Sequence, residues 1–354
     1  MNTTIDTIYS DYTNDKTLSK YADIINNGGL VAFPTETVYG LGADALNENA
    51  VLKIFKVKNR PANNPLIAHI SSLDMLDRIA KNIPQEFYRL FHTFWPGALT
   101  VVLDKKNCVP HSVCAGGDTV AVRFPSHPIA SKLIELADTP IVAPSANLSG
   151  KPSPTRFEHV FEDLNTKVDG IIDGGDCDIG IESTVISYIG TNALKILRPG
   201  AITKEMLEDK GFSVEIDEHV LIPAQSTDKV ASPGMLYKHY APNAKMELVR
   251  GTDSDVISYI QNKIKNSEYR CGVLCFDGET KFFKNTFCYE YGIKDFPLTL
   301  SKNLFSALRE FNNTNVEYIY ARVIEPKGVG LGIYNRMLRA ASFNVTALKN
   351  GEII

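Results

Sequence analysis

The sequence contains a dense group of positive side chains that could bind phosphate. Lys53, Lys56, Lys58 and Arg60 follow one another with no acidic residue among them, and Asn64 comes shortly after. A lysine offers a mobile point charge, whereas the planar fork of an arginine can bind two oxygens at once. Runs of charge are, however, more often a solvated helix face. The group alone therefore leaves both a phosphate site and an ordinary surface open.

Small polar residues follow two apolar segments of the chain. Residues 144–150 read Pro-Ser-Ala-Asn-Leu-Ser-Gly, and residues 34–42 read Pro-Thr-Glu-Thr-Val-Tyr-Gly-Leu-Gly, in which Glu36 is the one carboxylate. Hydroxyl, amide and backbone N–H groups at the carboxyl ends of strands are where open α/β sheets bind ligands. Ordinary capped turns have the same composition. Each segment is a candidate binding loop, and neither is decisive alone.

Arg123 ends an apolar segment that starts at Thr119. An arginine is costly to bury without a partner. Its fork suits the carboxylate of a ligand, held by two parallel hydrogen bonds. An internal Asp or Glu is the alternative partner.

These residues need a framework, and the apolar patterning of the first 215 residues predicts an α/β domain. Asn47 is a candidate N-cap for a helix that should end before Arg60, because Pro61 disfavours helical backbone at the preceding residue. Further helices are expected over 17–27, 84–93 and 128–137. Strands are expected over 30–33, 66–70, 100–103, 119–123, 141–143, 168–172, 184–188 and 194–197. Some links between strands are short, so we expect a twisted mixed sheet over about residues 8–215.

The pattern changes after residue 215. Residues 216–243 are expected to form a linker, because residues 223–242 hold little periodic hydrophobicity and are rich in Ser, Pro, Gly and Tyr. Alternating strand-like and helical segments then predict a smaller βαβ-type domain over 244–354. Gly328, Gly330 and Gly332 do not make a dinucleotide fingerprint and are interpreted as a flexible turn before a helix that begins near Tyr334.

The composition is that of an ordinary soluble globular protein. The chain has 354 residues, a net charge of −4 and six cysteines. This charge gives no general attraction to nucleic acid, and so few cysteines suggest reduced thiols. The N-terminal residues do not resemble a secretory signal, and no apolar run is long enough to span a bilayer, so the cytoplasm is expected. Cys108, His111 and Cys114 lack a second half with zinc spacing and are interpreted as an ordinary loop.

Eight segments taken together resemble one family. They read PTETVYGLGADA, IFKVKNRPANNPL, WPGALTVVL, VAVRFPSHP, APSANLSGKPSPT, STVI, LRPGAIT and SPGMLYKHYAP. Their order and spacing are similar to those of the YrdC-like threonylcarbamoyl-adenylate synthases, in the long two-domain form. The resemblance covers nearly the whole chain and is weakest after Lys245. One departure is Asn59, where the family pattern has glycine.

The resemblance implies a fold and a set of site residues. The fold would be a YrdC-like twisted mixed sheet with a concave basic cavity, then a linker and a smaller Rossmann-like α/β domain. The implied catalytic residues are Lys58, Arg60, Ser145 and Asn147. The implied ATP contacts are Arg60, Asn64, Thr119, Ser145, Ser153, Arg198 and Tyr240. The implied threonine contacts are Thr37, His69, Arg123, Ala143 and Ser183. Residues 232–242 would cover the nucleotide, with Tyr240, or less surely Tyr237 or His239, contacting it.

The implied reaction condenses L-threonine, bicarbonate or CO₂, and ATP to threonylcarbamoyl-AMP and pyrophosphate, with Mg²⁺ accompanying ATP. The product would pass to a tRNA threonylcarbamoyl transferase complex, and neither a stable nucleic-acid partner nor a membrane is expected. An RNA-binding YrdC-like module without enzymatic activity is the alternative. The acidic chain and the lack of an RRM-like aromatic stripe speak against it. A carbamoyl-transfer enzyme of the hydrogenase-maturation type should carry paired CxxC motifs, which the sequence lacks.

Overall fold

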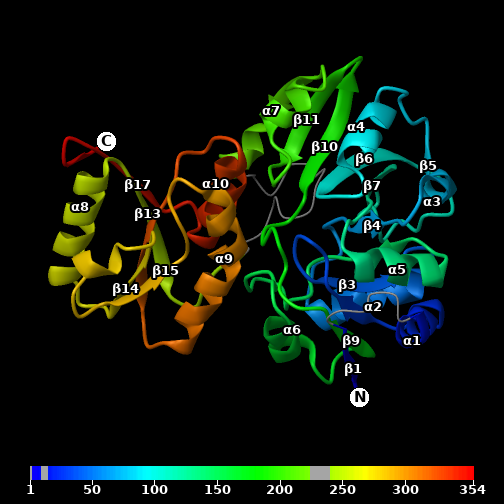
Figure 1. Ribbon diagram of the computed structural model, residues 1–354, viewed down its shortest axis with the longest axis horizontal. Helices are drawn as coiled ribbons and strands as arrows, with labels where there is room; N and C mark the ends of the chain where they lie inside the picture. Colours follow the sequence, from blue (N-terminus) through cyan, green and yellow to red (C-terminus); the bar gives the residue numbers. More distant parts are fainter. Residues whose placement is uncertain (1, 9–14, 224–239) are drawn as a thin grey trace. The chain divides into compact units, whose positions relative to one another are not determined.

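The computed structural model describes residues 2–8, 15–223 and 240–354. The chain divides into two compact units, which we describe separately (Figure 1). The first unit contains residues 1–149 and 153–236. The second contains residues 237–354 together with the short segment Gly150–Pro152, whose carbonyl at Pro152 accepts hydrogen bonds from Arg309.

The first unit is built on one mixed sheet that contains both parallel and antiparallel strand pairs. Its strand order is β1-β9-β2-β3-β8-β4-β7-β6-β10-β11-β12, and β5 pairs with β6 outside this path. The strands are β1 (Thr4–Thr7), β2 (Val31–Phe33), β3 (Gly40–Asp44), β4 (Ile67–His69), β5 (Ala80–Lys81), β6 (Leu99–Lys105), β7 (Thr119–Arg123), β8 (Ile141–Val142), β9 (Gly170–Asp173), β10 (Thr184–Gly190), β11 (Ala193–Arg198) and β12 (Ser213–Ile216). This confirms the predicted α/β class with a large mixed sheet.

Seven helices and one 3₁₀ turn complete the described part of the first unit. They are α1 (Asp15–Asn26), α2 (Glu48–Lys58), α3 (Leu73–Ile79), α4 (Phe87–Phe94), α5 (Pro128–Ala137), α6 (Phe157–Leu164), α7 (Lys204–Glu208) and η1 (Glu218–Val220). The predicted cap of α2 is present, because the Asn47 side chain accepts from the backbone N–H of Ala50. Helices α1 and α5 pack side by side (Figure 1).

The sheet extends beyond the expected limits of residues 8 and 215. Strand β1 lies before residue 8 and pairs in parallel with β9, and β12 ends at Ile216. The sequence hides β1 because its residues are mostly polar and exposed, so no apolar alternation marks them. Strand β3 was also not predicted, because it is rich in glycine. Gly42 is required there, since a Cβ would lie 2.6 Å from the Phe33 ring.

The second unit is a three-layer α/β arrangement. Its six-stranded sheet has the order β15-β14-β16-β13-β17-β18, in which all neighbours are parallel except β17 and β18. The strands are β13 (Lys245–Arg250), β14 (Cys271–Cys275), β15 (Phe287–Glu290), β16 (Tyr318–Arg322), β17 (Val345–Lys349) and β18 (Glu352–Ile353). The helices and 3₁₀ turns are α8 (Asp253–Lys265), α9 (Pro297–Glu310), α10 (Val329–Ala340), η2 (Thr280–Phe282) and η3 (Phe311–Asn313). Figure 1 shows α8 on one face of this sheet and α9 with α10 on the other.

The interpretation of Gly328, Gly330 and Gly332 as a flexible turn was wrong. Helix α10 begins at Val329, so Gly330 and Gly332 lie inside it and Gly328 is its N-cap. A Cβ at position 330 would lie 2.5 Å from the Glu325 carbonyl oxygen, so the glycine permits a close approach of backbone rather than flexibility. Within the part of the chain that the structure describes, no helix is both long enough and apolar enough to cross a membrane.

Candidate active site

The two candidate binding loops lie against each other in the first unit. The backbone N–H of Leu41 donates to the Pro144 carbonyl, and the N–H of Ala146 donates to the Tyr39 carbonyl, each at 2.8 Å. Gly40 and Ser145 also form an isolated antiparallel bridge. A Cβ at Gly40 would lie 3.0 Å from the Cβ of Ala143, so glycine allows this close approach. The antiparallel pairing of β3 with β8 therefore brings segments about 100 residues apart to one site.

Lys58 is the cation that ties α2 to this site. It is the last residue of α2 and only 1% exposed. Its Nζ donates to the carbonyl oxygens of Ser145 and Asn147, and its own carbonyl accepts from the N–H of Ser149 at 2.9 Å. The helix ends here because Asn59 adopts the left-handed conformation, with φ 51° and ψ 47°. The lysine is a buried component of the loop, not part of a solvated helix face.

The remaining predicted phosphate contacts form two pairs. Ser145 Oγ donates to Asn147 Oδ1 at 2.6 Å, and Asn147 Nδ2 donates to the Leu148 carbonyl at 2.8 Å. Arg60 Nη2 donates to the carbonyl of Asn64 at 3.3 Å. Asn64 is buried, and its Oδ1 has no hydrogen-bond partner among the described residues. Three of the four predicted catalytic residues are thus in direct contact, and Arg60 contacts Asn64 instead.

A second group of charged and polar side chains surrounds Arg123 at the end of β7. Arg123 Nη1 donates to Thr37 Oγ1 at 2.8 Å, Nη2 forms an ion pair with Glu36 Oε1 at 2.7 Å, and Nε donates to the Gly97 carbonyl at 3.3 Å. His69 lies opposite Arg123 in the parallel register of β4 and β7. The internal acid that the sequence left open as a partner is therefore Glu36. A guanidinium has five N–H groups, so both terminal nitrogens keep one for a ligand.

The electrostatics of this group follow from burial and from its one ion pair. Burial alone would raise the pKa of Glu36, but the charge and the hydrogen bond of Arg123 bring the pKa of this carboxyl below its ordinary value. Burial, with the positive charge of Arg123, lowers the pKa of His69 to about 3. His69 is therefore neutral near pH 7. Its Nδ1 lies 3.2 Å from the Ile67 carbonyl, to which it must donate, so Nε2 carries the lone pair.

Ser183, a predicted threonine contact, is hydrogen-bonded to Arg198, a predicted ATP contact. Arg198 donates to Ser183 twice, from Nη2 to Oγ and from Nε to the carbonyl oxygen, each at 3.1 Å. The Ser183 hydroxyl also lies 2.7 Å from that of Thr100. A Cβ at Gly200 would come within 2.6 Å of the backbone there, so β10 and the segment after β11 pack tightly. A predicted threonine contact and a predicted nucleotide contact are thus hydrogen-bonded to each other.

The structure does not gather all the predicted residues. Thr119 begins β7 and is exposed, at the opposite end of the strand from Arg123. Tyr240 belongs to the second unit, where its ring stacks on Phe305 at 5.0 Å between centroids. Tyr237 and His239 lie outside the described residues. Contact of Tyr237, His239 or Tyr240 with the nucleotide remains a prediction.

Three buried residues of the site were not assigned from the sequence. Glu36 pairs with Arg123, Thr100 contacts Ser183, and Glu182 accepts from the buried Ser153 hydroxyl at 2.5 Å. Each acid directly precedes an assigned residue, Thr37 or Ser183, which is the signal that could have drawn attention to it. Thr100 carries no such signal, because it sits within an apolar strand.

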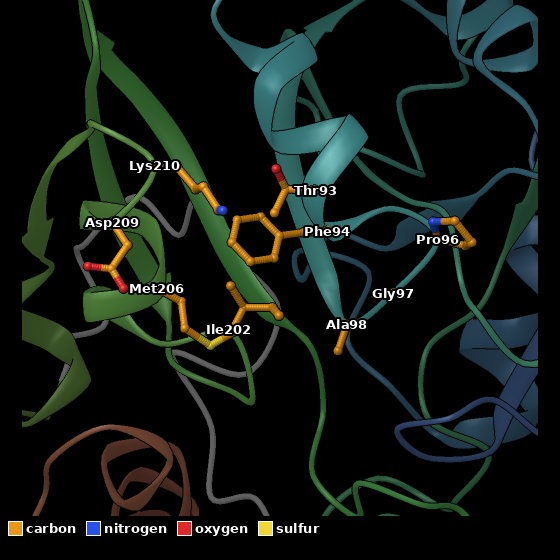
Figure 2. A pocket seen from close by; sticks show the side chains of 9 residues that line it. All are labelled: Thr93, Phe94, Pro96, Gly97, Ala98, Ile202, Met206, Asp209 and Lys210. Carbon is orange, nitrogen blue, oxygen red and sulfur yellow. The ribbon is translucent and has the colours of Figure 1, made fainter.

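A separate hollow in the first unit contains none of the predicted contacts. Figure 2 shows it between the end of α4, with Phe94, and the region of α7, with Ile202 and Met206. Lys210 and Asp209 lie on its polar side. We assign no substrate to it, because none of the predicted contact residues lines it.

Comparisons with known proteins cover both units. Residues 23–200 match a family model described as telomere recombination, of the Sua5, YciO and YrdC proteins. Residues 202–342 match a model described as the threonylcarbamoyl-AMP synthase C-terminal domain.

Individual relatives are similar over nearly their whole length. The threonylcarbamoyl-AMP synthase of Pyrococcus abyssi is 45% identical over 92% of this chain and 94% of the relative. That of Bacillus subtilis is 41% identical over 94% of this chain and 95% of the relative. The crystal structure of P. abyssi Sua5 complexed with L-threonine superposes with a TM-score of 0.92 and 43% identity, covering 98% of this chain and all of that one.

Proposed function

This chain belongs to the threonylcarbamoyl-AMP synthases in their two-domain form, and we propose how its residues make that product from L-threonine, bicarbonate or CO₂, and ATP. The family resemblance suggested by the sequence motifs is confirmed. The relatives are named as synthases, so the comparisons favour the enzyme over the RNA-binding alternative.

Threonine binds to the group around Arg123 in this proposal. The N–H groups left on the two terminal nitrogens of Arg123 suit the α-carboxylate in a bidentate grip. Thr37 and neutral His69 can exchange hydrogen bonds with the substrate hydroxyl. Ser183 and the backbone at Ala143 complete the pocket. That P. abyssi Sua5 was crystallised with L-threonine supports this substrate.

ATP binds to the group around Lys58. The positive charges of Lys58, Arg60 and Arg198 balance the negative charges of the phosphates. Hydrogen bonds to the nucleotide can come from Ser145, Asn147, Asn64 and Ser153. The described residues contain no group of three or more His, Cys, Asp or Glu side chains that could hold a metal ion. We propose that Mg²⁺ accompanies ATP and is bound to its phosphate oxygens, as is usual for this ion.

The reaction needs no protein nucleophile. The threonine ammonium group loses one proton to give the amine, which adds to CO₂ and loses a second proton to form a carbamate; with bicarbonate, the amine displaces water. A carbamate oxygen then attacks the α-phosphorus of ATP. The bond from that phosphorus to the bridging oxygen breaks, and pyrophosphate leaves with the electron pair. Catalysis is then mainly positioning of two bound reactants and stabilisation of negative charge. Because the step transfers the AMP group of ATP to the carbamate oxygen, the enzyme is a nucleotidyltransferase in this proposal.

One observation carries this proposal more than any other. Arg198 is predicted to contact ATP and Ser183 to contact threonine. The two residues are hydrogen-bonded to each other, and both are buried. Ala143 is also only two residues from Ser145. Groups for the two reactants therefore adjoin, as an attack of one reactant on the other requires. We further propose that the product serves a tRNA threonylcarbamoyl transferase in the cytoplasm.

The direct test uses labelled bicarbonate. The purified full-length chain is incubated with ATP, Mg²⁺, L-threonine and labelled bicarbonate, and the mixture is analysed rapidly by mass spectrometry. We expect a threonine-dependent adenylate that carries the label, with an equal amount of pyrophosphate. A folded sample that binds ATP but forms no labelled adenylate would refute the proposed reaction, and RNA titration would then test the binding module.

A further inference from the structure

Glu36 has a buried carboxylate oxygen without a hydrogen-bond donor. The residue is 7% exposed, and its Oε1 forms the ion pair with Arg123. Its Oε2 has no hydrogen-bond partner among the described residues. The backbone N–H groups of Glu36 and Ser126 lie near the carboxyl, but neither completes a hydrogen bond to it. Leaving such an oxygen unsatisfied is costly, so it is suited to accept from a ligand.

The carboxylate lies among the residues that the proposed function gives to threonine. Arg123 contacts both Glu36 and the hydroxyl of Thr37. His69 is opposite Arg123 in the sheet, and its titration is affected by both Arg123 and Glu36. The backbone carbonyls of Glu36 and Thr37 accept from the N–H groups of Ile179 and Gly180, which fixes the turn that carries them.

Bound threonine carries two charges, its α-carboxylate and its α-ammonium group, into this buried site. The proposed function gives an oppositely charged partner only to the carboxylate. Its carboxylate is matched by Arg123, but its α-ammonium group also needs an acceptor of opposite charge. His69 is neutral and His127, whose pKa is also lowered by burial, supplies no negative charge. Among the described side chains that contact Arg123 or Thr37, Glu36 is the one carboxylate.

We propose that Glu36 Oε2 accepts a hydrogen bond from the α-ammonium group of threonine, while Oε1 continues to hold Arg123. The four charges then alternate, from carboxylate of the substrate to Arg123, Glu36 and the substrate ammonium, and sum to zero. This arrangement fixes the nitrogen that must later react with CO₂ or bicarbonate. The inference rests on the proposed function, since it takes threonine to be the ligand of this group.

The test compares two ligands that differ only in the amine. L-Threonine and (R)-3-hydroxybutyrate share the carboxylate and the hydroxyl, but the second lacks the ammonium group. Binding of each to the full-length wild type and to Glu36→Gln is measured by calorimetric titration, with ligand-observed NMR for the weaker ligand. We expect Glu36→Gln to lower the affinity for L-threonine by about tenfold or more, as loss of a charged hydrogen bond predicts. The affinity for (R)-3-hydroxybutyrate should change much less.

Two other results would overturn the inference. Equal weakening of both ligands would mean that Glu36 acts only by holding Arg123, because both ligands have the carboxylate. Unchanged binding of both would mean that Glu36 does not contribute at all. ATP affinity of the variant serves as the control for folding.

A second variant protects the test against misfolding. Glu36→Asp keeps the charge on a side chain shorter by one methylene. The affinity of this variant for L-threonine should fall moderately but remain higher than its affinity for (R)-3-hydroxybutyrate. Loss of that preference in a folded Glu36→Asp variant would contradict the inference, because the retained charge would then not hold the ammonium group, and full wild-type affinity for L-threonine would contradict the placement of the carboxylate. A wild type that neither binds L-threonine nor forms labelled adenylate would instead refute the proposed function.

Discussion

Lys58 and His69 are both almost fully buried, yet they serve the site in different ways. Lys58 donates to two loop carbonyls, so it shapes the loop that carries Ser145 and Asn147 as well as bringing charge to it. His69 is 3% exposed and stays neutral, because burial and Arg123 disfavour its protonated form. The two residues lead to separate predictions.

Replacing Lys58 by methionine should lower both activity and stability. Lys58→Met keeps the length of the side chain but leaves the carbonyls of Ser145 and Asn147 without their shared charged donor. We expect kcat/KM to fall by about tenfold to a hundredfold, and the free energy of unfolding to fall by about 1–3 kcal/mol. Steady-state kinetics and denaturant titration measure the two effects. Lys56→Met, at an exposed position of the same helix, is the matched control and should change neither. Equal kinetics in both variants would remove Lys58 from the mechanism.

The buried neutral state of His69 should make stability depend on pH. In the folded chain its pKa is about 3, whereas an unfolded histidine titrates near 6.5. Below pH 6.5, His69 is therefore protonated in the unfolded state but stays neutral in the folded state. The free energy of unfolding consequently falls as the pH falls. The slope from this residue approaches about 1.4 kcal/mol per pH unit.

Denaturant titrations at pH 7, 6 and 5 check this, since the range stays above the ordinary pKa of Glu36. The free energy of unfolding should decline less steeply in His69→Gln than in the wild type. His127 is shifted in the same direction, but it is present in both proteins and cancels. Parallel declines in the two proteins would show that His69 is not held neutral.

At this scale the sequence predicted residue types better than partners. Lys58, Ser145 and Asn147 were assigned together and are in contact. Glu36 was noticed but given no role, because the pairing of its carboxylate with Arg123 depends on two segments 87 positions apart in the sequence meeting through the sheet. No local pattern encodes such a contact.

The end of α2 shows how an element positions a functional residue. Asn59 follows Lys58 in the left-handed conformation, and its N–H donates to the carbonyls of Phe55 and Lys56. This turn releases Arg60 from the helix toward Asn64. The family pattern has glycine at this position, and the backbone explains why, since glycine and asparagine are the residues that adopt this conformation most readily.

Substitutions at Asn59 should therefore separate backbone from side-chain effects. Asn59→Gly should leave activity unchanged and alter the free energy of unfolding by less than about 0.5 kcal/mol. Asn59→Val should lose about 1–2 kcal/mol, because a β-branched residue is strained at positive φ. Thermal and denaturant unfolding measure both. Leu52→Val, at an exposed position within the same helix, controls for the effect of valine on helix propensity. A valine equally harmless at both positions would contradict the assigned conformation.

Elements with a strong local pattern were predicted well. Strand β7 and helix α5 have the predicted limits, since one is a short apolar run and the other an apolar-periodic segment that starts with proline. Strands β1 and β3 lack such patterns and depend on their neighbours in the sheet. The start of α10 was missed because its glycines were interpreted as a flexible turn, whereas Gly330 permits a close approach of backbone and Gly328 is an N-cap with positive φ.

The whole molecule consists of two units, each with its own sheet and its own buried core. The predicted substrate contacts other than Tyr240 lie in the first unit, and Tyr240 lies in the second. The family resemblance also implies that residues 232–242 cover the nucleotide, and such a cover would shield threonylcarbamoyl-AMP, a mixed anhydride that water hydrolyses, from solvent. The second unit would then be needed for yield of product more than for the folding of the first.

Truncation tests this division. A chain that ends near Val230 keeps the complete first sheet and core, so we expect it to unfold cooperatively, but it should release less threonylcarbamoyl-AMP per ATP consumed. Mass spectrometry of product against pyrophosphate gives this ratio directly. The full-length variant Tyr240→Ala is the companion measurement and should reproduce part of the loss. Equal product yield from the truncated and full-length chains would show that the second unit has no protective role.

The pairing of β1 with β9 also constrains how the protein is made. Thr4–Thr7 hydrogen-bonds in parallel to Gly170–Asp173, so two segments about 166 residues apart form one edge of the first sheet. On a ribosome, the earlier strand leaves the exit tunnel long before its partner exists. At roughly 5–20 residues per second this interval lasts on the order of 10–30 s. During that time β1 has no partner strand, so it has to be polar enough to remain solvated without pairing. Its exposed Thr4 and Thr7 and its half-buried Asp6 are polar side chains suited to that delay, which gives the weak apolar pattern of β1 a reason in biogenesis.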